Sequence, residues 1–174
     1  MLAVPPSHYG YFGPVGTFTH QALLTLPRCE TSPRRTRLSA WRCRPCRDGD
    51  VAAALVPIEN SGRRRRLRRP WTTWPTGEPL RITREVVLPV QFTLFARNGT
   101  QLHDVRRVLT HPHAAAQCRD WLARHLADAV ITEGGSTAAA AAEVADPRSR
   151  FDAAICADIA GELNRLDTAG DRHC

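Results

Sequence analysis

The second half of the chain shows a regular alternation of apolar patterns. From residue 105 onward, short apolar runs of the β type are followed by stretches in which apolar residues recur at helical spacing. The predicted strands are 105–109, 129–132 and 151–156, and the predicted helices are 114–126, 137–145 and 158–166. Strands separated by single helices predict a parallel sheet built from right-handed crossovers. We expect Trp121, Leu122 and Leu126 to form the inner face of the first of these helices.

The first half of the chain is less regular. A short aromatic strand over 9–13 precedes a helix over 20–26, and 51–58 is typical of a buried strand of the parallel type. A long β run over 85–96 contains Pro89, which indicates a bend or an edge strand. We interpret this run as the crossing between two lobes. The predicted fold class is therefore α/β, with two lobes of parallel-rich sheet and flanking helices.

Polar residues stand where several predicted strands end. Ligands bind at the carboxyl ends of strands in open α/β sheets. Thr17 precedes the first helix in a glycine-containing turn, where unpaired N–H groups also bind anions, although a plain helix cap explains it equally well. The other candidates at such positions are Glu59-Asn60-Ser61, Thr110, and Ser136 with Thr137. His111 and His113 could transfer protons or bind a metal, but beside Pro112 a structural role is commoner.

Two stretches, 28–47 and 62–75, break the pattern. Neither stretch shows a helical or a strand period. Each carries a net charge of +6, so the rest of the chain has a net charge of −5, although the whole chain has a net charge of +7. Lysine is absent and every Lys-or-Arg position is arginine, which is typical of a GC-rich gene. A nucleotide sequence that can encode residues 70–75, when read in a frame moved by one nucleotide, encodes Leu-Asp-Asp-Leu-Ala. Our hypothesis is that both stretches are frameshifted, and an unbroken frame in the gene would refute it. Alternatively, Arg63–Arg66 form a basic patch for nucleic acid or acidic lipid, although no aromatic stacking platform accompanies them.

Length and composition exclude several classes of protein. The 174 residues suffice for two small lobes. They do not begin like a signal peptide, and no apolar run reaches the roughly 20 residues that span a bilayer. We therefore expect a cytoplasmic protein with no membrane partner. Cys43 and Cys46 form a lone CxxC pair with too few ligands for a closed zinc site, so we expect no metal.

Six segments together resemble prephenate dehydratase, the enzyme of phenylalanine synthesis. In chain order they are YFGPVGTFTHQALL, ALVPIENS, GEPLRITREVVLPVQFTLFAR, VLTHPHAAAQC, GGSTAAAAAEVA and DAAICADIAGEL. One such motif is weak evidence, but six in the family's order, over about two thirds of the chain, are highly specific. The resemblance implies two α/β lobes like a type II periplasmic binding protein, with the active site in the cleft.

The resemblance also implies a reaction, the decarboxylating dehydration of prephenate to phenylpyruvate. Formation of an aromatic ring drives this reaction, so no cofactor is implied. The protein must hold a dianion, orient the departing groups and help to protonate the leaving hydroxyl. By resemblance, the catalytic candidates are Glu59, Asn60, Thr110 and Gln117, and the substrate-lining candidates are Thr17, Ser61, Ser136 and Thr137.

Two family features do not occur in the 174 residues. These are the Thr-Arg-Phe motif, which holds the family's catalytic threonine, and the phenylalanine-sensing ACT domain. We expect a first lobe at 1–88, including the aberrant stretches, a second lobe at 89–166, and an irregular tail at 167–174. We therefore expect a truncated chain, and the alternative functions are a non-catalytic binding fragment and a basic nucleic-acid binder. Prephenate is the expected partner, nucleic acid is not expected, and a homodimer stays open.

Overall fold

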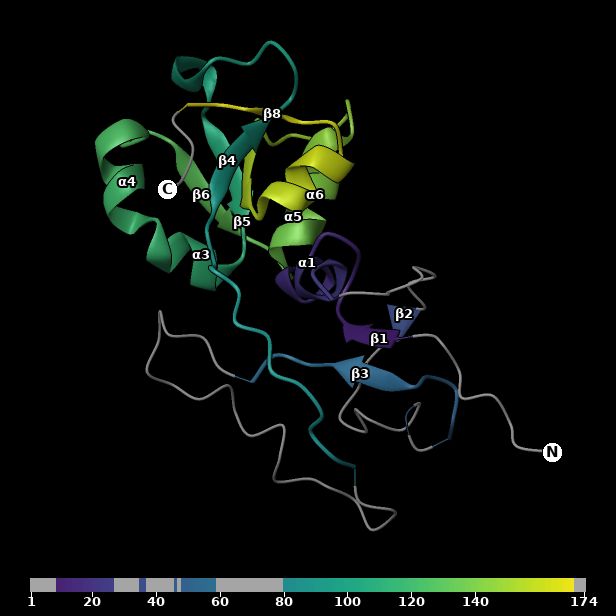
Figure 1. Ribbon diagram of the computed structural model, residues 1–174. Helices are drawn as coiled ribbons and strands as arrows, with labels where there is room; N and C mark the ends of the chain where they lie inside the picture. Colours follow the sequence, from purple (N-terminus) through teal and green to yellow (C-terminus); the bar gives the residue numbers. More distant parts are fainter. Residues whose placement is uncertain (1–8, 27–34, 37–45, 47, 59–79, 171–174) are drawn as a thin grey trace, which may run out of the picture. The chain divides into compact units, whose positions relative to one another are not determined.

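The chain divides into two compact units (Figure 1). The computed structural model describes residues 9–26, 35–36, 46, 48–58 and 80–170. The first unit comprises Met1–Pro14 and Thr19–Leu88, and the second comprises Val15–Phe18 and Pro89–Cys174. Among the described residues, no helix combines the length and the apolar character that crossing a membrane requires.

The described part of the first unit is built on three short parallel strands. β1 (Tyr9–Phe12) lies between β2 (Arg35–Thr36) and β3 (Ala53–Leu55). α1 (Phe18–Leu24) follows β1, and only its first residue belongs to the second unit. The buried rings of Tyr11 and His20 stack with their centroids 5.0 Å apart, which joins the helix to the central strand.

Two elements of the first unit differ from the sequence prediction. β2 falls within 28–47, where no element was expected. β3 is parallel to β1 as predicted, but it covers three half-buried residues instead of the buried run 51–58. β3 lies at one edge of the described sheet, and Pro57 has no backbone N–H with which to continue a ladder. Together these two facts account for its shortness and its partial exposure.

The second unit contains a five-stranded mixed sheet in the order β6-β5-β7-β4-β8 (Figure 1). Its strands are β4 (Thr93–Ala96), β5 (Arg107–Thr110), β6 (Val130–Glu133), β7 (Ala153–Cys156) and β8 (Asp167–Thr168). β5 runs parallel to β6 and β7, as the strand–helix alternation predicts, whereas β4 runs antiparallel to β7 and β8. The strands β5, β6 and β7 therefore end at the edge of the sheet where β4 begins, and we call this the carboxyl edge.

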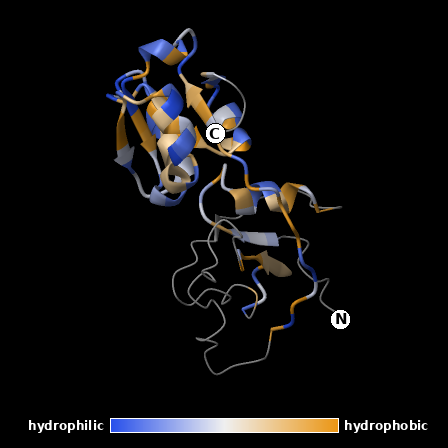
Figure 2. Cartoon of the chain, turned by 90° about the vertical axis from the view of Figure 1, so that its left-hand side faces the viewer, coloured by the Kyte–Doolittle hydropathy of each residue, from blue (hydrophilic) through white to orange (hydrophobic). Residues whose placement is uncertain are grey.

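Helices cover both faces of this sheet. The helical elements of the unit are η1 (Leu102–Asp104), α3 (Pro112–Gln117), α4 (Arg119–His125), α5 (Thr137–Ala145) and α6 (Asp158–Leu163). One apolar cluster joins α3 and α4 to Leu94, Val108 and Ile155 of the sheet. A second cluster joins α5 and α6 to Phe95, Leu109 and Ala154, whose side chains point the opposite way. In Figure 2 parts of the sheet of this unit are orange, while the helices also carry blue stretches.

The predicted helix over 114–126 is two helices. Cys118 separates α3 from α4 with φ −91° and ψ 8°, outside the helical range, although both flanking segments are helical. Trp121, Leu122 and Leu126 are nevertheless buried together, which confirms the predicted inner face. The apolar face of α4 therefore packs against the sheet in spite of the break.

Other boundaries were predicted too generously. The run 85–96 is a strand only over its last four residues, and the division between the units falls just before Pro89. α6 ends at Leu163 instead of Leu166, because Arg165 adopts a left-handed φ of 56° that ends the helix. The expected irregular tail is also wrong at its start, since Asp167 and Thr168 pair with β4 as the strand β8.

Close packing of α6 on β4 predicts an effect of enlarging Gly161. A Cβ atom at Gly161 would overlap the ring of Phe95, which is only 4% exposed and has no room to swing away. We expect Gly161→Ala to lower the free energy of unfolding by about 1–3 kcal/mol, the usual cost of overpacking. The measurement is urea denaturation of the full chain.

Gly135→Ala is the control for this substitution, because a Cβ at Gly135 meets nothing within 4 Å. It should change stability by less than about 0.5 kcal/mol. Equal stability of the two variants would show that α6 does not pack on Phe95 this closely.

Candidate functional site

The carboxyl edge of the second unit brings together polar residues from separate segments. α3, α5 and α6 each begin at this edge, directly after β5, β6 and β7. The first turn of a helix has N–H groups without partners in the helix, and these groups and the helix dipole attract anions. The edge is therefore the part of this unit that is best suited to a negatively charged ligand.

Thr110 is the last residue of β5 and is fully buried. Its Oγ1 atom donates a hydrogen bond of 2.7 Å to the backbone oxygen of Ile155 on β7. The hydroxyl proton is thus used within the protein, and the remaining lone pairs of Oγ1 can only accept. Thr110 holds the ends of β5 and β7 together, whatever part it takes in chemistry.

Ser136 and Thr137 stand where β6 leads into α5. The Oγ atom of Ser136 accepts a 3.0 Å hydrogen bond from the backbone N–H of Ala139, so Ser136 caps α5. Gly134 donates its backbone N–H to the oxygen of Thr110 at 2.7 Å, so the β6–α5 loop is fixed to the end of β5. The half-buried Thr137 is the first residue of the helix.

Thr17 belongs to the second unit, as part of the short segment Val15–Phe18. Its neighbour Gly16 lies against Ala138 in the first turn of α5 and Ala160 in the first turn of α6. Thr17, Thr110, Ser136 and Thr137 therefore all lie at the carboxyl edge, although they come from distant parts of the chain.

The remaining candidates are placed differently. Gln117 is exposed at the last position of α3, about 7.5 Å along the helix axis from its first residue, so it lies away from the helix start. Glu59, Asn60 and Ser61 lie outside the described residues. In the structure, four of the eight candidates from the sequence thus lie at one edge, and their functional roles stay predictions.

A polar pair at this edge was missed by the sequence analysis. Thr93, the first residue of β4, donates its hydroxyl proton to Oδ1 of Asp158 at 2.7 Å. Asp158 opens α6, where an acidic side chain is favourable because of the helix dipole. Its position after a predicted strand could have identified it, but Thr93 lies inside an apolar run and gives no such signal.

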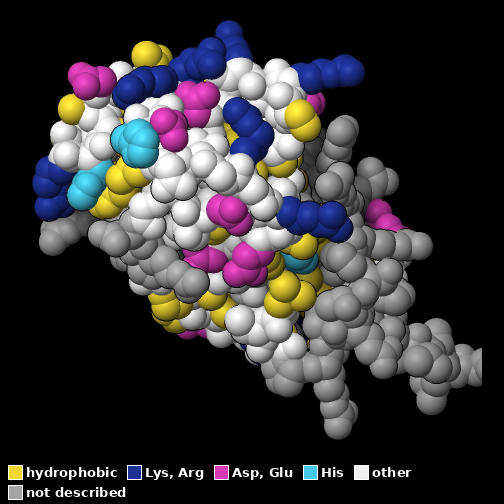
Figure 3. All heavy atoms as spheres, turned by 90° about the horizontal axis from the view of Figure 1, so that it is seen from above, with side chains coloured by type: hydrophobic (Ala, Val, Ile, Leu, Met, Phe, Trp, Pro, Cys, Tyr) yellow, Lys and Arg dark blue, Asp and Glu magenta, His cyan; other side chains and the backbone are white. Residues whose placement is uncertain are grey.

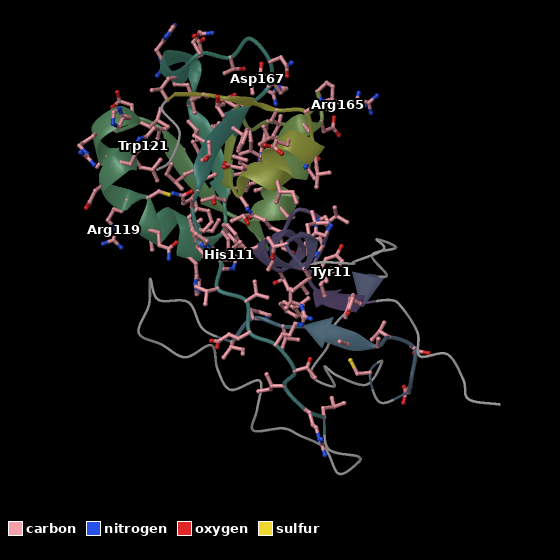
Figure 4. All side chains as sticks on the ribbon, in the orientation of Figure 1. Tyr11, His111, Arg119, Trp121, Arg165 and Asp167 are labelled. Atoms are coloured by element: carbon pink, nitrogen blue, oxygen red, sulfur yellow. The ribbon has the colours of Figure 1, made fainter. Side chains whose placement is uncertain are left out.

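His111 has a structural role at the start of α3 (Figure 4). Its Nδ1 atom accepts a 3.2 Å hydrogen bond from the backbone N–H of His113. Burial lowers the pKa of His111 below 6.5, the nearby His113 lowers this pKa further, and Glu133 opposes the shift. No group of three or more metal-ligating side chains occurs in the ranges that the structure describes.

Removing the hydroxyl of Thr110 should weaken the sheet. Thr110→Val leaves the oxygen of Ile155 without this donor, and we expect the free energy of unfolding to fall by about 1–3 kcal/mol. Thr110→Ser keeps the donor and should retain the bond. Denaturation curves for both variants test this prediction, and a valine variant as stable as the serine variant would contradict it.

The lowered pKa of His111 predicts acid sensitivity. As the pH falls below 6.5, the unfolded chain takes up a proton at this residue more readily than the folded chain does, so stability falls until the folded pKa is passed. His111→Asn keeps a capping side chain but does not titrate, so the loss of unfolding free energy below pH 6.5 should be less steep. His103→Asn, at an exposed side chain, is the control. Parallel pH profiles for the wild type and the His111 variant would argue against the prediction.

The comparisons with known proteins agree with this fold. The prephenate dehydratase family model matches residues 9–172. The prephenate dehydratase of Amycolatopsis methanolica is 41% identical over 163 residues, which are 90% of this chain and 50% of that protein. The chain spans about half the length of the curated relatives it matches.

Solved structures show the same likeness. The prephenate dehydratase of Arthrobacter aurescens, crystallised in complex with L-Phe, superposes with a TM-score of 0.82 and 36% identity, over 94% of this chain and 54% of that one. A protein described as a quorum-quenching acylase, GqqA, has a TM-score of 0.67 at 23% identity, covers 93% of this chain and 57% of its own, and shares the fold alone. The expected α/β class, like that of type II periplasmic binding proteins, is thereby confirmed. With a family match that extends from residue 9 to residue 172, this chain belongs to the prephenate dehydratase family.

Proposed function

We propose that this chain binds prephenate and takes part in its conversion to phenylpyruvate, carbon dioxide and water. The observation that carries the proposal is the family match over residues 9–172. The Arthrobacter relative crystallised with L-Phe supports small-molecule binding by the family. We place the reaction in the cytoplasm, without a membrane partner, and we propose a homodimer as the state to be tested.

The groups at the carboxyl edge suit the chemistry of this substrate. Prephenate carries two carboxylates, and one of them departs together with the hydroxyl in the same reaction. Neutral hydroxyls and helix N–H groups can bind a dianion through hydrogen bonds, although they carry no full positive charge themselves. Because the ring becomes aromatic as these groups leave, the protein supplies orientation and a proton for the departing hydroxyl, and no cofactor is required.

The proposed roles divide the candidate residues into two groups. Thr17, Ser136 and Thr137 line the substrate site, together with Ser61. Glu59, Asn60, Thr110 and Gln117 are the proposed catalytic positions. For Thr110, the bond to Ile155 supports a role as acceptor or as a support for the edge, since its proton is already donated.

The one face of the protein that Figure 3 shows offers little support for a nucleic-acid interface. On the face seen in Figure 3, dark blue Arg side chains are interspersed with magenta Asp and Glu side chains. Nucleic-acid interfaces gather basic residues on one face or along a stripe. The run Arg63–Arg66, which suggested this function, lies outside the described residues.

Titration of the full chain with prephenate tests the proposal. Thr137→Val keeps the size of the side chain and removes its hydroxyl, and we expect prephenate to bind at least about fivefold more weakly. Thr100→Ala is the control, since Thr100 follows the opposite end of β4. Phenylpyruvate formation, measured on the same samples, separates catalysis from binding.

Three outcomes are informative. Binding without turnover would leave a non-catalytic binding chain. Failure of the wild type to bind prephenate would contradict the proposed function. Tight, salt-sensitive binding to DNA that is lost when Arg63–Arg66 become alanine would support the nucleic-acid alternative.

A further inference from the structure

Gly16 occupies a position that both its backbone and its surroundings reserve for glycine. Its φ is +88°, in the left-handed region that residues with a Cβ atom avoid. A Cβ atom here would lie 3.2 Å from both Cα and Cβ of Ala160 and 3.6 Å from Cβ of Ala138. The first of these contacts involves backbone, so it could be relieved only if the segment or α6 moved.

The segment Val15–Phe18 is held on both sides of Thr17. On one side Gly16 lies against the first turns of α5 and α6. On the other side the Phe18 ring meets Phe92 edge-on, with centroids 5.3 Å apart and planes at 81°. Phe18 also packs against the apolar cluster that contains Phe92. Thr17 lies between these two anchors, with its Cα atom about 3.8 Å from that of Gly16.

The two helix residues under Gly16 are small. Ala138 is 5% exposed and Ala160 is fully buried, so both methyl groups are fixed within the packed unit. A larger residue at any of these three positions would push the segment away from the helix starts. The close approach therefore decides how near Thr17 lies to the start of α5.

We propose that Gly16 is a positioning residue for substrate binding, which seats Val15–Phe18 on Ala138 and Ala160 and so holds Thr17 at the carboxyl edge. This inference rests on the proposed function, because it assigns Gly16 to the site where prephenate is expected to bind. Gly16 itself needs no contact with the substrate.

The chain contains a matched control for the test. Gly99 has almost the same φ, +85°, but a Cβ atom there meets nothing within 4 Å. Alanine at Gly16 and at Gly99 therefore imposes a similar backbone penalty, and only the first substitution displaces a neighbour. In a prephenate titration of the full chain, we expect Gly16→Ala to raise the dissociation constant tenfold or more and Gly99→Ala to change it less than twofold.

A double-mutant cycle separates positioning from general destabilisation. Thr17→Ala should also weaken prephenate binding. The double variant Gly16→Ala/Thr17→Ala should bind no more weakly than Gly16→Ala alone, because the first change has already displaced Thr17. Additive losses, or equal effects of Gly16→Ala and Gly99→Ala, would overturn the proposal.

A measurement without ligand keeps this inference distinct from the proposed function. Hydrogen exchange of the amides in 15–18 should be faster in Gly16→Ala than in the wild type and unchanged in Gly99→Ala. If the wild type does not bind prephenate, the proposed function and the role of Gly16 in binding both fail. The exchange difference then still decides whether Gly16 seats the segment, and equal exchange in both variants overturns that contact as well.

Discussion

The second unit depends on the burial of β7 on both of its faces. All four of its side chains, Ala153 to Cys156, are completely shielded from solvent. Ala153 and Ile155 face the cluster of α3 and α4, and Ala154 and Cys156 face that of α5 and α6. A strand buried in this way has no polar face to offer, so its neighbours must satisfy every polar group nearby.

This constraint explains why the polar residues gather at one edge. The buried hydroxyls of Thr110 and Thr93 have partners inside the protein, in Ile155 and Asp158 respectively. Away from the sheet faces, the ends of β5 and β6 leave room for loops whose hydroxyls and amides can meet a ligand. The residues that complete the core and those suited to binding therefore occupy neighbouring positions, and one threonine can belong to both sets.

Much of the second unit could be predicted from the sequence because its apolar periods are long and regular. The inner face of α4 and the cap at Ser136 follow from local patterns. The antiparallel direction of β4 and the pairing of β8 could not be predicted, because they depend on contacts between distant segments. The break at Cys118 was missed for a related reason, since the apolar spacing continues across this residue while the helical backbone dihedral angles do not.

The second unit is not continuous in sequence, and this has a consequence for how it assembles during synthesis. Val15–Phe18 is synthesised before the rest of the second unit, and the alanines beneath Gly16 belong to α5 and α6, which are made much later. The contacts of this segment can therefore form only after α5 and α6 have been synthesised, and contacts between residues so distant in sequence are slow to form. A fragment that starts at Pro89 would leave Phe92 without its aromatic neighbour and the first turns of two helices uncovered. A fragment that is meant to contain the complete second unit must therefore include Val15–Phe18 as well as the chain from Pro89 onward.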